Sequence, residues 1–333
     1  MAMAGQQSFV DIEYSNRKKR TKREEFLTIM DTVIVWEEWC ALVEPYYPLG
    51  KRGRPPRGVE IMLRMYLLQN WFNLSDEGVE EAIYDSYAFR KFMKIDFMGE
   101  EQVPDATTLC KFRKLLNENG ITQRIFETIK GFLEQHGRIM HGGTIVDATI
   151  ISAPNSTKNE EKKRDPEMHS VQKGNKWFFG ARLHMGVDAG TGYIHSMQMT
   201  AANVEERAIV PELVRKDDHV VYGDAGYWRM ENRKEVKNDP HLSTIDWRMN
   251  SQKPYTKAAP WTPGEGIRWY RSLEYQKSRV RSKVEYSFLI LKRLFRYEKV
   301  RYRGIQKNRT QAFTLCALAN LFMLAQAMRA EVH

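Results

Sequence analysis

The stretch Thr144-Ile145-Val146-Asp147-Ala148-Thr149-Ile150-Ile151 decides the fold of this chain. Its β-branched and apolar residues predict a buried strand. Asp147 is the only charge in this run. A carboxylate buried in a strand is costly unless it is paired or binds a metal. The stretch therefore predicts a buried strand with a carboxylate that needs a partner or a metal.

Further strands and helices follow this stretch. Apolar runs predict three more strands, over Trp177–Asp188, Tyr193–Thr200 and His219–Asp224. Helical spacing predicts one helix over Val204–Arg215 and a long one over roughly Ser272–Tyr297. Three strands, a helix, a strand and a later helix indicate an α/β layered domain.

Two segments between these elements lack any apolar period. Asn155 to Lys176 is highly charged, so we expect a long loop there. Glu231 to Trp269 contains four prolines, so we expect an irregular insertion over about residues 231–270.

The chain before Gly142 has a helical pattern. We expect a flexible basic segment over residues 1–25 and a helical domain over residues 26–138. Four helices are predicted, over Val59–Phe72, Asp76–Met93, about Ala106–Gly120 and Ile121–His136. Short helices with tight turns resemble a helix-turn-helix cluster, although the same pattern builds any small helical bundle.

The charge of the 333-residue chain is concentrated in one place. The formal net charge is +10, whereas residues 266–309 alone hold 14 Lys or Arg and three Glu, a net charge of +11. Aromatic residues are interleaved with these charges, which suits phosphate neutralisation with stacking. A solvated helix face usually carries more carboxylates. The pattern therefore favours a surface that binds a polyanion.

Composition excludes several classes of protein. Three cysteines are too few and too scattered for a disulfide framework or a cysteine zinc site. The N-terminus has no basic region followed by an apolar run, so we expect no signal peptide. Thr310 to Met328 has no charge over 19 residues. Its polar residues and charged flanks favour a buried core helix over a membrane span.

A basic, proline-containing stretch, Lys51 to Gly58, precedes the first predicted helix. Arg52 and Arg54 lie in an Arg-Gly-Arg-Pro sequence that can enter an A·T-rich minor groove. The alternative is a rigid loop that starts the following helix. Both interpretations stay open.

Two more carboxylates stand out besides Asp147. Asp224 follows a strand and lies between Gly223 and Gly226, which leave room for a close backbone or ligand. The structural alternative is an aspartate that caps the next turn. Glu285 lies on the basic face of the long helix, four residues after Arg281, so an ordinary Arg–Glu pair is its structural alternative.

Asp147, Asp224 and Glu285 resemble the D-D-E triad of bacterial cut-and-paste transposases of the insertion sequence 5 family. The similarity extends over nearly the whole chain, in the stretches FVDIEYSNRKKRTKREEFL, VPDATTLCKFRKLL, TIVDATIISAPNSTKNEEKKRDPEMH, KGNKWFFGARLHMGVDAGTGYIHS, TAANVEE, GDAGY, RSKVEYSFLILKR and TLCALANLF. The family signature Y-x2-R-x3-E-x6-K is matched by Arg281, Glu285 and Lys292, but Ser278 stands in place of the tyrosine.

The resemblance implies a fold and a reaction. The fold is an RNase H-like catalytic domain, a mixed sheet flanked by helices over residues 139–330, after an α-helical N-terminal DNA-binding and dimerisation domain. The reaction is binding of terminal inverted repeats, hydrolysis that frees a 3′-OH, and attack of that 3′-OH on target DNA. A nuclease of the same fold, or a domesticated DNA-binding regulator, is the alternative.

The resemblance also implies a cofactor and partners. Asp147, Asp224 and Glu285 would hold two Mg²⁺ ions, which Mn²⁺ would replace, because hard oxygen ligands suit such ions. Arg281 and Lys292 would bind phosphates, and Trp228 would either stack on an unpaired base or pack in the protein. We expect a homodimer or a higher oligomer on DNA in the bacterial cytoplasm, associated with the nucleoid, and no membrane.

One histidine and one loop also lie near the implied site. His184 is expected to be a strand histidine with a hydrogen-bond partner rather than a site residue. The loop Asn155–Lys176 leaves the strand that bears Asp147. It is either a solvated linker or a flap that orders over DNA.

Overall fold

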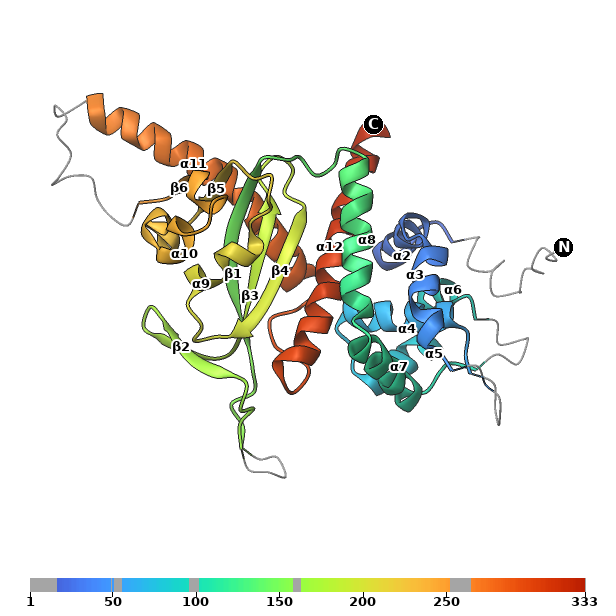
Figure 1. Ribbon diagram of the computed structural model, residues 1–333. Coiled ribbons are helices and arrows are strands. Elements are labelled where there is room, and N and C mark those ends of the chain that lie inside the picture. Colours follow the sequence, from blue (N-terminus) through green and yellow to red (C-terminus); the bar gives the residue numbers. More distant parts are fainter. Residues whose placement is uncertain are drawn as a thin grey trace.

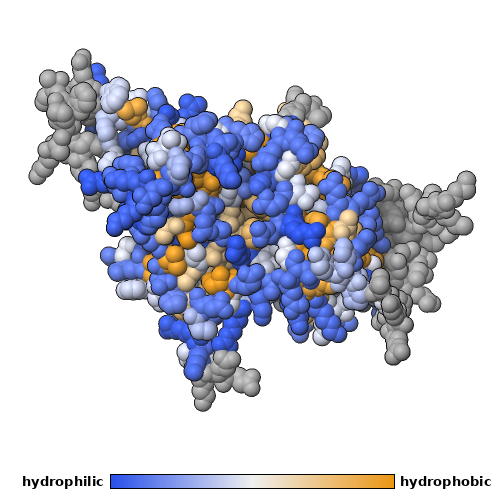
Figure 2. Space-filling model, in the orientation of Figure 1, coloured by the Kyte–Doolittle hydropathy of each residue, from blue (hydrophilic) through white to orange (hydrophobic). Residues whose placement is uncertain are grey.

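The computed structural model describes residues 17–48, 50, 56–95, 102–157, 163–251 and 265–332. A group of short helices lies on one side and a curled sheet on the other (Figure 1). Two longer helices, α8 (Ile121–Gln135) and α12 (Ile305–Val332), lie between them. The face seen in Figure 2 is mainly hydrophilic, and its apolar side chains form small separate patches.

Seven described helices precede the sheet. They are α2 (Lys22–Val33), α3 (Trp36–Val43), α4 (Val59–Phe72), α5 (Asp76–Asp85), α6 (Tyr87–Met93), α7 (Ala106–Glu118) and α8 (Ile121–Gln135). The sequence places α4 correctly. Its prediction of one helix over Asp76–Met93 is wrong, because Ser86 has an extended backbone, with φ −104° and ψ 114°, and separates α5 from α6.

Side-chain caps explain where two of these helices begin. The Ser75 hydroxyl accepts a hydrogen bond from the Gly78 amide at 2.9 Å at the start of α5. The Asp105 carboxylate accepts one from the Thr108 amide at 2.6 Å at the start of α7. Such caps satisfy amides that have no partner within their helix.

Six strands form one mixed sheet. They are β1 (Gly143–Ser152), β2 (His169–Lys173), β3 (Lys176–Asp188), β4 (Ile194–Ala201), β5 (Val220–Gly223) and β6 (Asp246–Met249). The strand β1 is central: it pairs antiparallel with β3 and parallel with β5, and β5 pairs parallel with β6. The other edge of β3 pairs antiparallel with β2 and then with β4.

Two of these strands, β2 and β6, lie in segments that were predicted to lack regular structure. The segment expected to be a loop contains β2, which forms an exposed hairpin with β3. The expected irregular insertion contains β6 and the short helix α10 (Lys234–Lys237). Both strands are short and largely polar because they lie at edges of the sheet, so they lack the apolar alternation that identifies a strand.

The segment that was expected to be a loop is also held by hydrogen bonds before β2 begins. Asp165 accepts a hydrogen bond from the Gly304 amide at 2.7 Å, and Glu167 accepts one from the Ile305 amide at 2.8 Å. Both carboxylates lie at the start of α12 (Ile305–Val332), where negative charge stabilises a helix. The described residues from 163 onward therefore do not form a free linker.

Helices cover both faces of the sheet. Ile145 and Ile151 of β1 belong to the main core, which also includes α12 and α11 (Glu265–Leu289). Val146 faces a smaller core under α9 (Glu206–Leu213) and α10. Because side chains alternate along a strand, Asp147 lies on the same face as Ile145, toward α11. The helix α11 begins before the expected start at Ser272 and ends in a π-helical turn, Ile290–Leu294.

The uncharged segment Thr310–Met328 lies within α12, and the expectation of a core helix is confirmed. By length and composition this helix is apolar enough to cross a membrane, but 78% of its apolar window is buried inside the protein. The Asn320 side chain accepts a hydrogen bond from the Ile194 amide at 2.9 Å and donates one to the Ile194 carbonyl at 2.7 Å. Asn320 thereby joins α12 to the backbone of β4.

We predict that Asn320→Leu lowers the free energy of unfolding by about 2–4 kcal/mol, because two buried backbone groups lose their partners. Urea denaturation measures this change. Met328→Ala is the control on the same helix, since Met328 is 49% exposed, and it should change stability by less than about 0.5 kcal/mol. An unchanged denaturation midpoint for Asn320→Leu would contradict the role of this residue.

Candidate active site

Asp147 lies in the middle of β1 with its side chain only 17% exposed. Its carboxylate accepts a hydrogen bond from the Ala148 amide at 2.7 Å. Burial raises the pKa of Asp147 to about 6, and repulsion from Asp224 acts in the same direction. The site therefore contains a carboxylate whose negative charge is poorly compensated by the protein.

Asp224 follows β5 and begins the short 3-10 turn Ala225–Tyr227. It accepts a hydrogen bond from the Gly226 amide at 2.7 Å, so the capping role considered from the sequence is confirmed. The space at Gly223 is taken up by the protein, because a Cβ there would lie 2.5 Å from the Met249 sulfur. Asp224 caps a turn and also lies close enough to act on the charge of Asp147.

Glu285 projects from α11, and its side chain is 60% exposed. Arg281 Nη2 lies 3.1 Å from Glu285 Oε1, which confirms the expected pair within the helix. Arg281 Nη1 lies 3.7 Å from Asp147 Oδ2. One guanidinium group therefore connects the glutamate of the helix to the aspartate of the central strand.

The hairpin turn between β3 and β4 positions α11. Lys283 Nζ donates hydrogen bonds to the carbonyls of Ala189 at 2.6 Å and Gly190 at 2.7 Å. The buried Ser287 hydroxyl donates one to the Gly192 carbonyl at 3.1 Å. These bonds attach the helix beside the sheet, next to β1.

The remaining expected contacts have different surroundings. Lys292 Nζ donates a hydrogen bond to the Ile150 carbonyl of β1 at 3.3 Å, and burial lowers the pKa of Lys292. Trp228 is half-buried directly after the turn that Asp224 caps. Ser278 accepts a hydrogen bond from the Asn250 side chain at 3.2 Å. Arg52 and Arg54 lie outside the described residues.

His184 lies on β3 and is fully buried. Its Nε2 lies within hydrogen-bond distance of the Thr200 hydroxyl, at 2.9 Å. Burial lowers its pKa to about 3, so the ring is neutral at physiological pH. The expectation of a strand histidine with a hydrogen-bond partner is confirmed.

Three residues near the aspartates were not singled out from the sequence. Glu206 begins α9 and pairs with Arg182 at 3.4 Å; burial and repulsion from Asp224 raise the pKa of Glu206. Tyr227 is buried, and burial together with Glu206, Asp147 and Asp224 raises its pKa well above the usual value. In the sequence, the feature that indicates Glu206 is the pair of consecutive glutamates in the stretch TAANVEE.

The donor chemistry of the site fits a hard divalent cation. Asp147 and Asp224 offer carboxylate oxygens, which Mg²⁺ and Mn²⁺ prefer. Their mutual repulsion is of the kind that a bound cation relieves. Among the residues that the structure describes, however, no three His, Cys, Asp or Glu side chains are grouped closely enough to hold a metal ion. Glu285 is held apart through Arg281 rather than placed with the aspartates.

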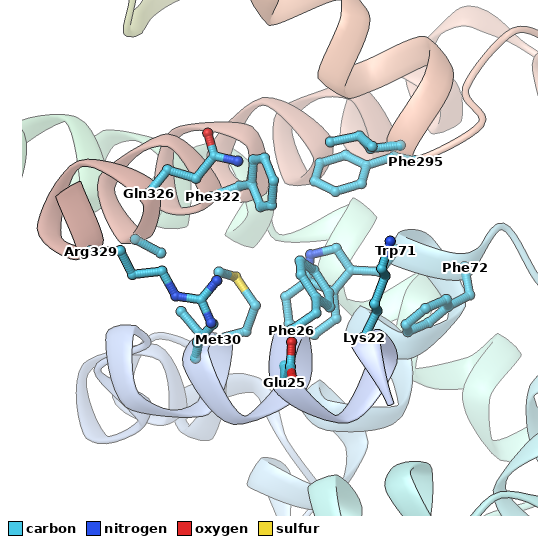
Figure 3. A pocket seen from close by; sticks show the side chains of 13 residues that line it. Lys22, Glu25, Phe26, Met30, Trp71, Phe72, Phe295, Phe322, Gln326 and Arg329 are labelled. Atoms are coloured by element: carbon cyan, nitrogen blue, oxygen red, sulfur yellow. The ribbon is translucent and has the colours of Figure 1, made fainter. Parts of the chain in front are cut away.

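An apolar pocket of about 470 Å³ lies away from these carboxylates, between α2, α4 and α12. Figure 3 shows Phe26 and Trp71 facing Phe295 and Phe322 across it, with Lys22 and Arg329 at its sides. None of the three carboxylates lines this pocket. It is therefore separate from the candidate site.

We predict that Asp147→Asn stabilises the protein in EDTA at pH 7.5 by about 2–3 kcal/mol. The folded-state pKa of Asp147, about 6, lies above its ordinary value of 3.8. The charged carboxylate therefore lowers the free energy of unfolding by its full amount above pH 6. This loss of stability becomes smaller as the pH falls toward 4. Urea denaturation at several pH values measures it. Asp85→Asn, at an exposed position, is the control. A difference that stays constant with pH would be inconsistent with a charged Asp147 that is largely removed from water.

Two family models match the chain. One is described as a transposase DDE domain and matches residues 139–321, and the other is described as a transposase domain (DUF772) and matches residues 15–115. No solved structure matches the chain. The first match covers more than half of the chain and includes Asp147, Asp224 and Glu285. The chain therefore belongs to the family of DDE transposases.

Proposed function

We propose that this transposase binds the terminal inverted repeats of an insertion sequence, cleaves the DNA there and joins the freed 3′ ends to target DNA. We further propose that it belongs to the insertion sequence 5 group, on the stretches that resemble that group. One observation carries the proposal: Asp147, whose side chain is largely covered near Asp224, is connected to Glu285 by Arg281. Three carboxylates from two strands and one helix thus lie around one region of the sheet.

The sheet supports an RNase H-like arrangement for this catalytic region. Its strand order is β3-β1-β5-β6, with β2 and β4 both paired to the outer edge of β3, and with β3 antiparallel and β5 parallel to the central β1. Asp147 lies on the central strand and Asp224 directly follows its parallel neighbour. We assign residues 26–138 to a helical DNA-binding and dimerisation domain and residues 139–330 to the catalytic domain.

We infer that Asp147, Asp224 and Glu285 hold divalent metal ions, which are Mg²⁺ in the cell. The positive charge of such ions would stabilise negative charge on the entering and leaving oxygens of a phosphodiester. The carboxylates fix where these ions lie relative to the sheet. The rigid central strand limits how far Asp147 can move, and the capping bond of Asp224 fixes the orientation of its side chain.

Basic side chains around the carboxylates would bind and orient the DNA backbone. Lys292 lies against Ile150 of β1, and we assign it to a phosphate next to the scissile bond. The structure describes all 14 basic residues in residues 266–309, and none of their side chains is buried. This accessibility supports a phosphate-binding role for the stretch. Arg52, Arg54 and Trp228 remain proposed DNA contacts, and assembly of two or more subunits on DNA remains proposed as well.

We predict that Glu285→Gln reduces Mg²⁺-dependent cleavage of a terminal-repeat duplex about 100- to 1000-fold or more, because a charged group that acts in the transition state is lost. Binding of the same duplex in a gel shift should stay within about twofold, since neutralising one exposed carboxylate removes no phosphate contact. Glu298→Gln is the matched control. Glu298 lies in the same basic stretch and is 59% exposed.

The outcomes separate the proposed functions. Loss of cleavage in Glu285→Gln, with binding retained and the control active, supports catalysis by the triad. Cleavage without joining to target DNA in the wild-type protein indicates a nuclease of this family. Binding without any cleavage by the wild-type protein indicates a DNA-binding regulator. Retained cleavage by purified Glu285→Gln excludes a metal-binding role for Glu285.

A further inference from the structure

Arg281 occupies the space between two of the three proposed metal ligands. Its Nη1 lies 3.7 Å from Asp147 Oδ2 and its Nη2 lies 3.1 Å from Glu285 Oε1. The Arg281 side chain is 23% exposed, so neighbouring groups cover most of it. A single cation therefore contacts a carboxylate on the central strand and one on α11.

This arrangement competes with a metal ion for the same carboxylates. An arginine side chain stays charged at any physiological pH and presents several donors in a rigid fork. Mg²⁺ needs carboxylate oxygens at about 2.0–2.1 Å in octahedral geometry. A guanidinium group that lies between Asp147 and Glu285 prevents both from approaching one ion. This explains why the described residues contain no grouped metal ligands although the three carboxylates surround one region.

We propose that Arg281 is a latch that keeps the divalent-metal site incomplete until the phosphate backbone of DNA displaces its side chain. The inference rests on the proposed function, in which the carboxylates hold metal and DNA is the substrate. A phosphate group offers Arg281 a bidentate partner that is at least as good as either carboxylate. When the guanidinium group turns to that phosphate, Asp147 and Glu285 become free to bind the cation.

The latch couples two events that the reaction needs together. In the free protein the positive charge of Arg281 offsets part of the negative charge of Asp147 and Glu285 while no metal is bound. Bound DNA adds negative charge and draws the Arg281 side chain away from Asp147 and Glu285. The affinity of the site for divalent cations therefore rises. By linkage, a bound cation raises the affinity for DNA by the same factor.

Other basic side chains near the site are held elsewhere. Lys283 donates to the hairpin turn of β3 and β4, and Lys292 donates to the backbone of β1. Arg279 lies two residues before Arg281 on the same helix and is exposed. Arg279 therefore provides a control with the same side chain and nearly the same sequence position.

The test measures Mn²⁺ binding to the full-length protein by the loss of the electron paramagnetic resonance signal of free Mn²⁺. Without DNA, Arg281→Ala should bind Mn²⁺ about tenfold more tightly than the wild-type protein, because two ion pairs no longer compete. Arg281→Gln, which keeps the size of the side chain but not its charge, should behave in the same way. Without DNA, Arg279→Ala should bind Mn²⁺ with the same affinity as the wild-type protein. Equal or weaker Mn²⁺ binding by both Arg281 variants overturns the proposal.

A second arm adds a duplex that carries the terminal repeat. The duplex should strengthen Mn²⁺ binding by the wild-type protein several-fold, and by Arg281→Ala much less. Asp147→Asn separates this proposal from the proposed function. If Asp147→Asn abolishes Mn²⁺ binding while both Arg281 variants bind like the wild-type protein, the latch is wrong and the metal site stands. If Asp147→Asn leaves Mn²⁺ binding unchanged with and without DNA, both proposals fail.

Discussion

Burial of the uncharged segment Thr310–Met328 of α12 between the helical part and the sheet is the constraint on which the remaining structure depends. Its apolar side chains belong to one core that continues from the N-terminal helices to the sheet. Because little water reaches this helix, its polar groups need partners inside the protein. Asn320 finds them on β4, and Thr314 finds one in the Tyr66 hydroxyl of α4, at 3.0 Å. The same helix thus attaches the edge of the sheet and the helical part to each other.

The candidate site depends on this frame for a different reason. A carboxylate in a central strand is costly, and the raised pKa of Asp147 reflects that cost. A rigid sheet is able to hold such a group in place, whereas a loop would rearrange to expose it. The attachment of α11 to the hairpin turn then brings Arg281 and Glu285 to the same face of the sheet. The charge of Asp147 lowers the free energy of unfolding, and a bound cation together with DNA would restore it.

The sequence predicts the elements that carry a strong local pattern. Four features follow from neighbouring residues: the β-branched run of β1, the apolar helix α4, the uncharged segment of α12 and the Arg281–Glu285 pair. Resemblance added the order of the three carboxylates. The short edge strands β2 and β6 were missed because their residues are largely polar.

Contacts between distant parts of the chain were also out of reach. The ion pair between Asp147 and Arg281, and the position of Glu206 near the aspartates, join residues that no period or spacing relates. Arg281 contacts Asp147 because α11 packs on one face of the sheet. Glu206 lies near the aspartates because α9 packs on the other face. The expected metal ligands and Arg281 were named from the sequence, but the contact between Arg281 and Asp147 was not.

The central claim is that Asp147 and Asp224 form a binding site for a divalent cation, and iron-directed cleavage of the protein tests it most directly. Fe²⁺ replaces Mg²⁺, and ascorbate with peroxide then produces hydroxyl radicals that cut the backbone next to the bound ion. In the presence of a terminal-repeat duplex we expect cuts within β1 around Asp147 and in the turn after β5 around Asp224, and we expect Asp147→Asn to lose them. Cuts spread along the whole chain, or gathered away from these two strands, would contradict the account.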